Sequence, residues 1–508
     1  DVDLSYPSQL LPDMGAYAFN NPLLLARIMS TSSMDSNCSI AVDSHIDSAA
    51  LARGVSDDGV SVAVAVETLR ALSTRTTYDL HHPIVFVFGC EEEGLQSATM
   101  FIENHPWGRP SVCAAIDLEA GGVADMAEVL LQASGGGIAT VYGKAAPHPV
   151  GFALSSDLFQ KFDIGGTDFN IYQQAGIPSL DLVFVHGGEK YHTPYDSIDA
   201  IKPEALQHMG ENLINILPEL SNQLTQKDLV KEDVPAGWLM SYTVASVLTI
   251  NGQWGLWVLF TILTFSGIAV VIIYHRNYWI LASISIVLGA IWTVLSIVGS
   301  IIIAIISGLL ATSTNQLRFN ANPVTTVVTC AIASILGLLL PQLVFTRMIN
   351  RVFTCRKGGA SLEPKSIELF HLCGLLLVYG IIFIILAAIK FSYAYTIVMH
   401  MLFSLISLVS LLFINDSAAP LHKLLHIDFL TRIPLVIKMF DHVVPLFFSL
   451  LPSLIWDLEA FYYLVQSLGV KLTMDDSAIQ SFCCLQLVQS SSPSHSHQWF
   501  HTCMEDQR

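Results

Sequence analysis

Two adjacent glutamates, Glu91 and Glu92, stand at the end of an apolar run that begins at Ile84. A run of apolar and β-branched residues between turns predicts a strand that is buried on both faces. Ligands in open α/β sheets bind beyond the carboxyl ends of the strands. Charges at that place need a partner, and a metal ion is the simplest one. Taken alone, the pair predicts a solvated turn equally well, because charge clusters often follow strands.

Histidines and acids occupy similar places elsewhere in the N-terminal half of the chain. Imidazole and carboxylate groups are the ligands of catalytic zinc, which keeps open positions for water. Two zinc ions about 3.5–4 Å apart, bridged by one carboxylate, form the usual two-metal hydrolase site. Such a site needs two histidines and three acids as ligands, and one further carboxylate as a base. With Glu91 and Glu92, the chain supplies that set through His45, Asp57, Glu119 and His192.

The elements that would position these residues alternate between strands and helices. The apolar patterns predict strands over residues 40–42, 84–90, 111–118 and 178–185, and helices over 21–29, 60–72, 95–104 and 203–220. Strands that alternate with helices indicate an α/β fold with a mostly parallel sheet flanked by helices. The candidate residues then lie at strand ends or in the loops that follow them.

Composition divides the chain into two parts. The 508 residues are 52% hydrophobic and 13% charged, with 42 acidic against 24 basic residues. The acidic residues concentrate before about Gly237, and long apolar runs follow it. We therefore expect a soluble acidic domain over residues 1–236, an α-helical multi-span membrane domain over 237–460 and a low-complexity tail over 461–508. The acidic balance argues against nucleic acid as a partner and indicates nothing about the oligomeric state.

Six apolar stretches are each long enough to cross about 30 Å of hydrocarbon. They are residues 254–274, 279–310, 324–345, 369–388, 395–414 and 434–455. The stretch 279–310 is longer than one span requires, so it could tilt, kink or contain a hairpin. Basic residues fall in the first and third connections, which places those loops in the cytosol and the acidic domain on the opposite side of the membrane. These residues are Arg276, Arg347, Arg351, Arg356, Lys357 and Lys365.

The nine cysteines lack the paired CxxC spacing of a structural zinc finger. Cys38 and Cys113 could form a disulfide if the acidic domain lies in an oxidising lumen. The triplet Asn37-Cys38-Ser39 is formally a glycosylation sequon. Because the chain starts at Asp1 without a methionine or signal peptide, we expect either a fragment or a missing targeting portion.

Five motifs place the candidate residues along the chain: His45-Ile46-Asp47-Ser48, Ser56-Asp57-Asp58-Gly59, Cys90-Glu91-Glu92-Glu93-Gly94-Leu95, Ile116-Asp117-Leu118-Glu119 and Tyr191-His192-Thr193. Their order and strand contexts over residues 40–220 resemble the M28 family of zinc aminopeptidases and carboxypeptidases. With the apolar half attached, the chain is similar to the endoplasmic reticulum branch of that family, in which a lumenal peptidase domain precedes several membrane spans.

The resemblance implies a role for each matching residue. His45, Asp57 and Glu119 would hold one zinc ion, and Asp57, Glu92 and His192 the second, with Asp57 bridging. Glu91 would be the general base, and Asp47 would hold the ring of His45 through its other nitrogen. The Asp57–Asp58 bond is a candidate cis peptide. Tyr191 and Asp168 are candidate substrate contacts, whereas His186 and Glu189 would be ordinary loop residues.

One ligand remains open between two acids. Many members of the family have aspartate where Glu119 stands, and Asp117 lies two residues before it. Residues two apart on a strand share a face, so alternation does not choose between Asp117 and Glu119.

The function that the resemblance implies is a membrane-anchored metallo-exopeptidase of the endoplasmic reticulum. It would hydrolyse peptide bonds with water activated by two zinc ions per chain, and its partners would be a peptide substrate and the lipid bilayer. Two alternatives belong to other classes: an inert membrane scaffold or receptor with a peptidase-like domain, and a single-zinc acyl or cyclising transferase on the same scaffold.

Overall fold

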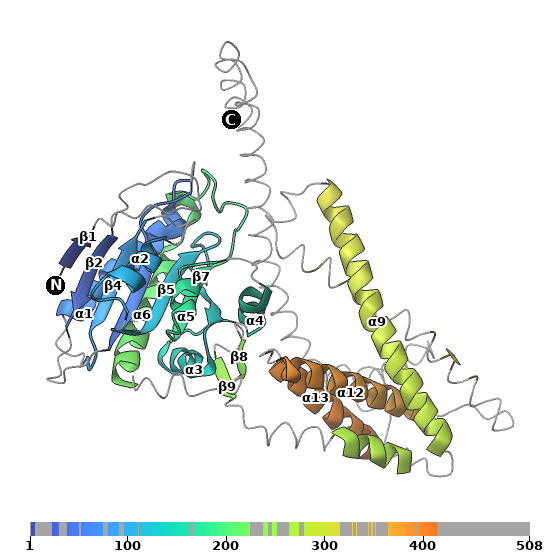
Figure 1. The fold of residues 1–508 in the computed structure, drawn as a ribbon. Coiled ribbons are helices and arrows are strands. Elements are labelled where there is room, and N and C mark those ends of the chain that lie inside the picture. The colour runs from blue at the N-terminus through green and yellow to red at the C-terminus, as the bar shows by residue number, and fades with distance from the viewer. Residues whose placement is uncertain are drawn as a thin grey trace, which may run out of the picture.

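A computed structural model describes residues 2–5, 23–29, 38–49, 52–74, 80–90, 96–109, 111–151, 153–162, 166–223, 237–241, 246–250, 264–273, 279–314, 364–389 and 394–413, with isolated positions between them. A seven-stranded sheet lies at the centre of the N-terminal half, in the order β1-β2-β4-β3-β5-β7-β6 (Figure 1). The strands are β1 (Val2–Ser5), β2 (Leu23–Ile28), β3 (Ser39–His45), β4 (Ile84–Gly89), β5 (Val112–Ala120), β6 (Val129–Ala133) and β7 (Ser179–Phe184).

The sheet is mixed, which corrects the expectation of a mostly parallel one. β4, β3, β5 and β7 run parallel to one another, but β6 pairs antiparallel with β7, β2 with β4, and β1 with β2. The expected helix over residues 21–29 is also wrong, because β2 occupies that segment. Leu23 and Leu25 are buried, and β2 forms hydrogen bonds with the free edge of β4. Pairing in the tertiary structure therefore overrides the helix propensity of leucine.

Helices cover both faces of the sheet because the strands bury apolar residues on both of them. On one face Ile40 and Val42 pack against the cluster that contains Val64, Leu213 and Leu217. On the other face, alternate strand residues pack against a second cluster. The first face is covered by α1 (Ser61–Thr74), α3 (Gly136–Ala145) and α6 (Pro203–Gln223), and the second by α2 (Gln96–Asn104) and α5 (Phe169–Gln174). The α4 helix (Ala153–Phe162) contributes Phe159 to a smaller cluster beside β6 and β7.

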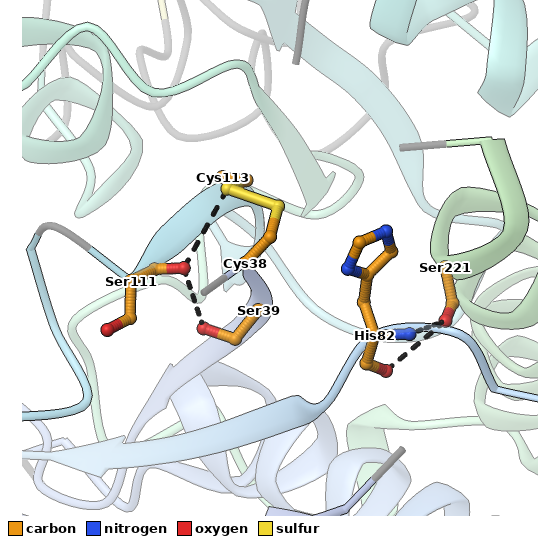
Figure 2. The surroundings of a disulfide bond; sticks show 6 residues. All are labelled: Cys38, Ser39, His82, Ser111, Cys113 and Ser221. Atoms are coloured by element: carbon orange, nitrogen blue, oxygen red, sulfur yellow. Dashed lines mark hydrogen bonds between the residues drawn. A yellow bond between two sulfur atoms is a disulfide. The ribbon is translucent and has the colours of Figure 1, made fainter. Parts of the chain in front are cut away.

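A disulfide joins Cys38 and Cys113 at the start of the neighbouring strands β3 and β5, with Cα atoms 5.4 Å apart (Figure 2). Next to it, Ser39 Oγ donates to the Ser111 carbonyl at 3.2 Å. Both cysteines therefore lie at the amino ends of the parallel strands, whereas His45 and Glu119 lie at the opposite ends. The crosslink stabilises the sheet without touching the candidate site.

Replacing both cysteines with alanine should lower the free energy of unfolding by about 2–4 kcal/mol, because the crosslink closes a long loop in the unfolded chain. The two cysteines are separated by 75 positions in the sequence. The measurement is the urea concentration at which the full chain in detergent becomes sensitive to a short protease pulse. Reductant should shift the parent protein to the same midpoint. An unchanged midpoint in both tests would contradict a stabilising crosslink.

Within the described residues, the apolar half contains three long helices: α9 (Trp279–Thr314), α12 (Pro364–Ala388) and α13 (Ala394–Phe413) (Figure 1). They share a buried apolar cluster, and α9 meets α12 so closely at Gly289 that a Cβ on Gly374 would lie 2.5 Å from the Ala290 nitrogen. A two-stranded hairpin, β8 (Gly237–Ser241) and β9 (Ser246–Ile250), precedes them in the sequence.

The structure tests the predicted spans only in part. Within the described residues, Ala282–Ile303 and Leu369–Ala388 have the length and apolar composition to cross a bilayer. The stretch 279–310 forms one continuous helix rather than a hairpin. Residues 434–455, the tail 461–508 and most of 324–345 lie outside the described residues, so the six-span count stays a prediction.

Candidate metal centre

His45 and Glu119 come together through the register of the parallel strands. Asp43 of β3 pairs with Asp117 of β5, so His45 and Glu119 each lie two residues beyond that pair and on the same face. His45 Nε2 is 3.6 Å from Glu119 Oε2. Asp117 lies two residues earlier on β5, where its carboxylate accepts a hydrogen bond from the Phe169 backbone at 2.7 Å. The structure thus places Glu119, and not Asp117, beside His45.

Asp57 lies in the irregular turn η1 (Val55–Val60), between two histidines. Its Oδ1 is 3.2 Å from His45 Nε2, and its Oδ2 is 3.1 Å from His192 Nε2. Both Asp57 and His45 are 1% exposed. The two oxygens of one buried carboxylate therefore face one imidazole each.

The distances match those between ligands of a common ion. Two ligand atoms about 2.1 Å from a tetrahedral zinc ion stand roughly 3.4 Å apart. His45, Asp57 and Glu119 each offer an atom within 4.8 Å of the others. Among the described residues, His45 Nε2 and both Asp57 oxygens are buried and form no hydrogen bond. Buried polar atoms of this kind are rare unless something else pairs with them, so these residues fit a metal ion.

The charges of the site depend on one another. Burial by itself would lower the pKa of His45, but the charge of Glu119 and the carboxylates of Asp47 and Asp57 outweigh burial and raise that pKa above its ordinary value. Burial would raise the pKa of Asp57, and contacts with His192 and His45 outweigh it and lower that pKa. The surrounding carboxylates thus favour a positive charge at this position, and a bound cation would provide one.

Neighbouring groups hold the ligand segments in place. His45 Nδ1 is 3.0 Å from the Asp47 carbonyl and 3.6 Å from the Asp47 carboxylate, so Asp47 does contact the other ring nitrogen. The Asp57–Asp58 peptide is cis, which confirms that prediction. Asp58 Oδ2 accepts a hydrogen bond from the His45 backbone at 3.3 Å.

Asp196 is a residue that the sequence analysis missed. Its buried carboxylate accepts hydrogen bonds from the Ser56 backbone at 2.9 and 3.0 Å and from the Asp57 backbone at 3.2 Å. It therefore fixes the turn that carries Asp57 to the segment that carries His192. Nothing in the sequence distinguishes Asp196 from other loop acids, because its partners are 139 and 140 positions away.

The two candidate substrate contacts, Tyr191 and Asp168, have different neighbours. The ring of Tyr191 stacks on that of His192 with centroids 3.7 Å apart. Asp168 is buried at the start of α5 and contributes to the raised pKa of Asp117, which results first from burial and then from the charges of Glu119, Asp181 and Asp168. Glu91 and Glu92 lie outside the described residues. β4 ends at Gly89, which pairs with His45, so the chain leaves β4 beside the site.

Comparisons with known proteins find similarity in the N-terminal half of the chain. Residues 24–217 match Peptidase family M28. "Endoplasmic reticulum metallopeptidase 1" of Homo sapiens is 39% identical over 187 residues, which cover 36% of this chain and 20% of that protein. "Putative endoplasmic reticulum metallopeptidase 1-A" of Caenorhabditis elegans is 35% identical over 184 residues, covering 35% and 20%. The match spans about a fifth of the length of these relatives.

Two further similarities have lower sequence identity. "Vacuolar membrane protease" of Candida dubliniensis is 30% identical over 255 residues, covering 49% of this chain and 26% of that protein. Among solved structures, the LapA aminopeptidase of Legionella pneumophila is 18% identical, with a TM-score of 0.34, covering 44% of this chain and 60% of that chain.

Proposed function

Since residues 24–217 match Peptidase family M28, we propose that this chain is a membrane-anchored zinc exopeptidase that removes terminal residues from peptides. The observation that carries the proposal is the position of Asp57, whose two carboxylate oxygens face His45 and His192 at 3.2 and 3.1 Å. A carboxylate between two imidazoles is the arrangement by which one side chain bridges two metal ions.

Two zinc ions per chain would have two ligand sets that share Asp57. His45, Asp57 and Glu119 would hold one ion, and Asp57, Glu92 and His192 the other. The buried atoms of His45 and Asp57 that form no hydrogen bond support this assignment. When bound, zinc would act as a Lewis acid toward the scissile carbonyl and lower the pKa of water.

The protein's own side chains would orient the groups and move the proton. Glu91 would take a proton from the attacking water and pass it to the leaving amine. Asp47 would fix the ring of His45 through Nδ1, consistent with its contacts of 3.0 and 3.6 Å. Tyr191, which stacks on His192, and Asp168 would contact the substrate.

We propose an endoplasmic reticulum membrane location with the peptidase domain, residues 1–236, in the lumen. Residues 237–460 would form the membrane domain and 461–508 a polar tail. The Cys38–Cys113 disulfide supports an oxidising compartment. The two candidate membrane helices and the names of the relatives support the membrane.

Removal of metal from the full chain in detergent should abolish hydrolysis of fluorogenic amino-acid amides, and added zinc should restore it. Elemental analysis of the reconstituted protein should give two zinc ions per chain. An N-acetylated amide series and a series of peptides with free carboxyl termini would identify the terminus attacked. One zinc ion per chain without hydrolysis would favour the single-zinc transferase, and bound zinc with no turnover of any series would favour the inert scaffold.

A further inference from the structure

The segment that follows β5, residues 121–125, contacts two other segments that carry candidate ligands. The Ala124 backbone donates to Ser56 Oγ at 3.0 Å, next to Asp57. The Val123 backbone donates to the His186 carbonyl at 2.7 Å, six residues before His192. Because β5 itself carries Glu119, residues 121–125 connect three of the segments that form the site.

The contact with His186 is close and specific. A Cβ on Gly122 would lie 2.2 Å from the His186 carbonyl oxygen, so the two backbones meet where only glycine fits. Gly187 has a φ of 68°, and a Cβ there would lie 2.6 Å from Val123 Cγ2. The two segments therefore pack in one arrangement.

A side-chain pair completes this contact. His186 Nδ1 lies 2.5 Å from Asp125 Oδ1, and the two side chains are 26% and 18% exposed. A short imidazole–carboxylate contact that is mostly shielded from water is stronger and more directional than a solvated pair. It fixes the point at which the chain leaves β7 and enters the loop that ends at His192.

The loop that carries His192 is thus anchored on each side by a carboxylate. Downstream, buried Asp196 binds the backbone of Ser56 and Asp57. Upstream, Asp125 binds His186. The loop between them turns tightly, with Lys190 bonded to Gly187 and His192 at a φ of 57°. A loop of this kind transmits a displacement of its first residue to His192, because its backbone has little freedom to absorb the change.

We propose that Asp125 and His186 are positioning residues that hold His192 at the correct distance from Asp57 to bind the second zinc ion. The inference rests on the proposed two-metal function. The Asp125–His186 pair should affect the second ion alone. His45 and Glu119 lie at the ends of β3 and β5, and the loop from 186 to 192 does not set their positions. Loss of the pair should weaken one zinc site and leave the other intact.

The test is chelator competition for zinc with the full chain in detergent. Asp125→Ala and His186→Ala should each weaken one of the two zinc equivalents by about 10–100-fold, as loss of groups that orient ligands does. His186→Asn keeps a donor at the place of Nδ1 and should restore most of the affinity. The Asp125→Ala/His186→Ala double variant should resemble either single variant, because the two residues act as a unit.

His148→Ala is the matched control. His148 Nε2 pairs with Glu211 Oε2 of α6 at 2.9 Å, and the contacts of these two residues do not include residues 121–125 or 186–192, so its loss should leave both zinc affinities unchanged. Unchanged affinities in the Asp125 and His186 variants would overturn the positioning role and leave the two-zinc proposal intact. Equal weakening of both equivalents would also overturn it. A parent protein that binds one zinc ion would refute the two-metal proposal and this inference together.

Discussion

Replacing Asp57 with asparagine should remove both zinc ions and reduce peptide hydrolysis on the order of 10³-fold or more. Its two oxygens face His45 and His192 at 3.2 and 3.1 Å, so one side chain would serve both ions. An amide carries no charge, and its nitrogen cannot bind a cation. Losing both ions removes several kcal/mol of transition-state stabilisation, and each 1.36 kcal/mol or so is a factor of ten in rate. The readouts are elemental analysis and turnover of an amino-acid amide by the full chain.

Asp181→Asn is the matched control for this variant. Asp181 is another fully buried aspartate of the sheet, and burial together with the charge of Glu119 raises its pKa to about 8. Since burial favours the neutral form of this carboxyl group, an uncharged asparagine is a close replacement for it. The Asn oxygen can also accept the hydrogen bonds from Gln132 and Thr167. This variant should keep its zinc. Retention of both ions by Asp57→Asn would show that Asp57 does not bridge them.

Replacing Glu91 with glutamine should lower the rate of hydrolysis by about 10²–10⁴-fold while both zinc ions stay bound. Glutamine has nearly the shape of glutamate but cannot accept a proton at neutral pH, so it removes proton transfer and leaves the space filled. The expected pattern is a loss in kcat with a KM close to that of the parent protein.

Variants of the two neighbouring glutamates, Glu92 and Glu93, are the controls for the Glu91 variant. Glu92→Gln should lose one zinc ion, since Glu92 is the proposed ligand of the second ion. Glu93→Gln alters the third glutamate of the same segment and should keep both zinc binding and turnover. Undiminished hydrolysis by Glu91→Gln would remove Glu91 from the mechanism, and loss of zinc from that variant would make it a ligand instead of a base.

Local pattern was sufficient for the elements that are long and strongly periodic. The structure contains β4, β5, β7, α1 and α6 close to the predicted ranges, because each buries apolar residues at the spacing of its own helix or strand. Short or edge elements were different. β2 was predicted as a helix, and β6, α3, α4 and α5 were not anticipated. Their conformation depends on the neighbours they pair with or cover, which a short stretch of sequence does not specify.

The sequence by itself determined the kinds of candidate ligand, since histidines and acids stand at or after strand ends, and folding does not change which donor atoms a side chain carries. Only the tertiary structure decided which of them meet. The pairing of Asp43 with Asp117 places Glu119 beside His45, a choice that alternation within one strand cannot make. Asp196 and the Asp125–His186 pair were likewise invisible in the sequence. Their partners are 61 to 140 positions away, and only the folded sheet brings such distant residues into contact.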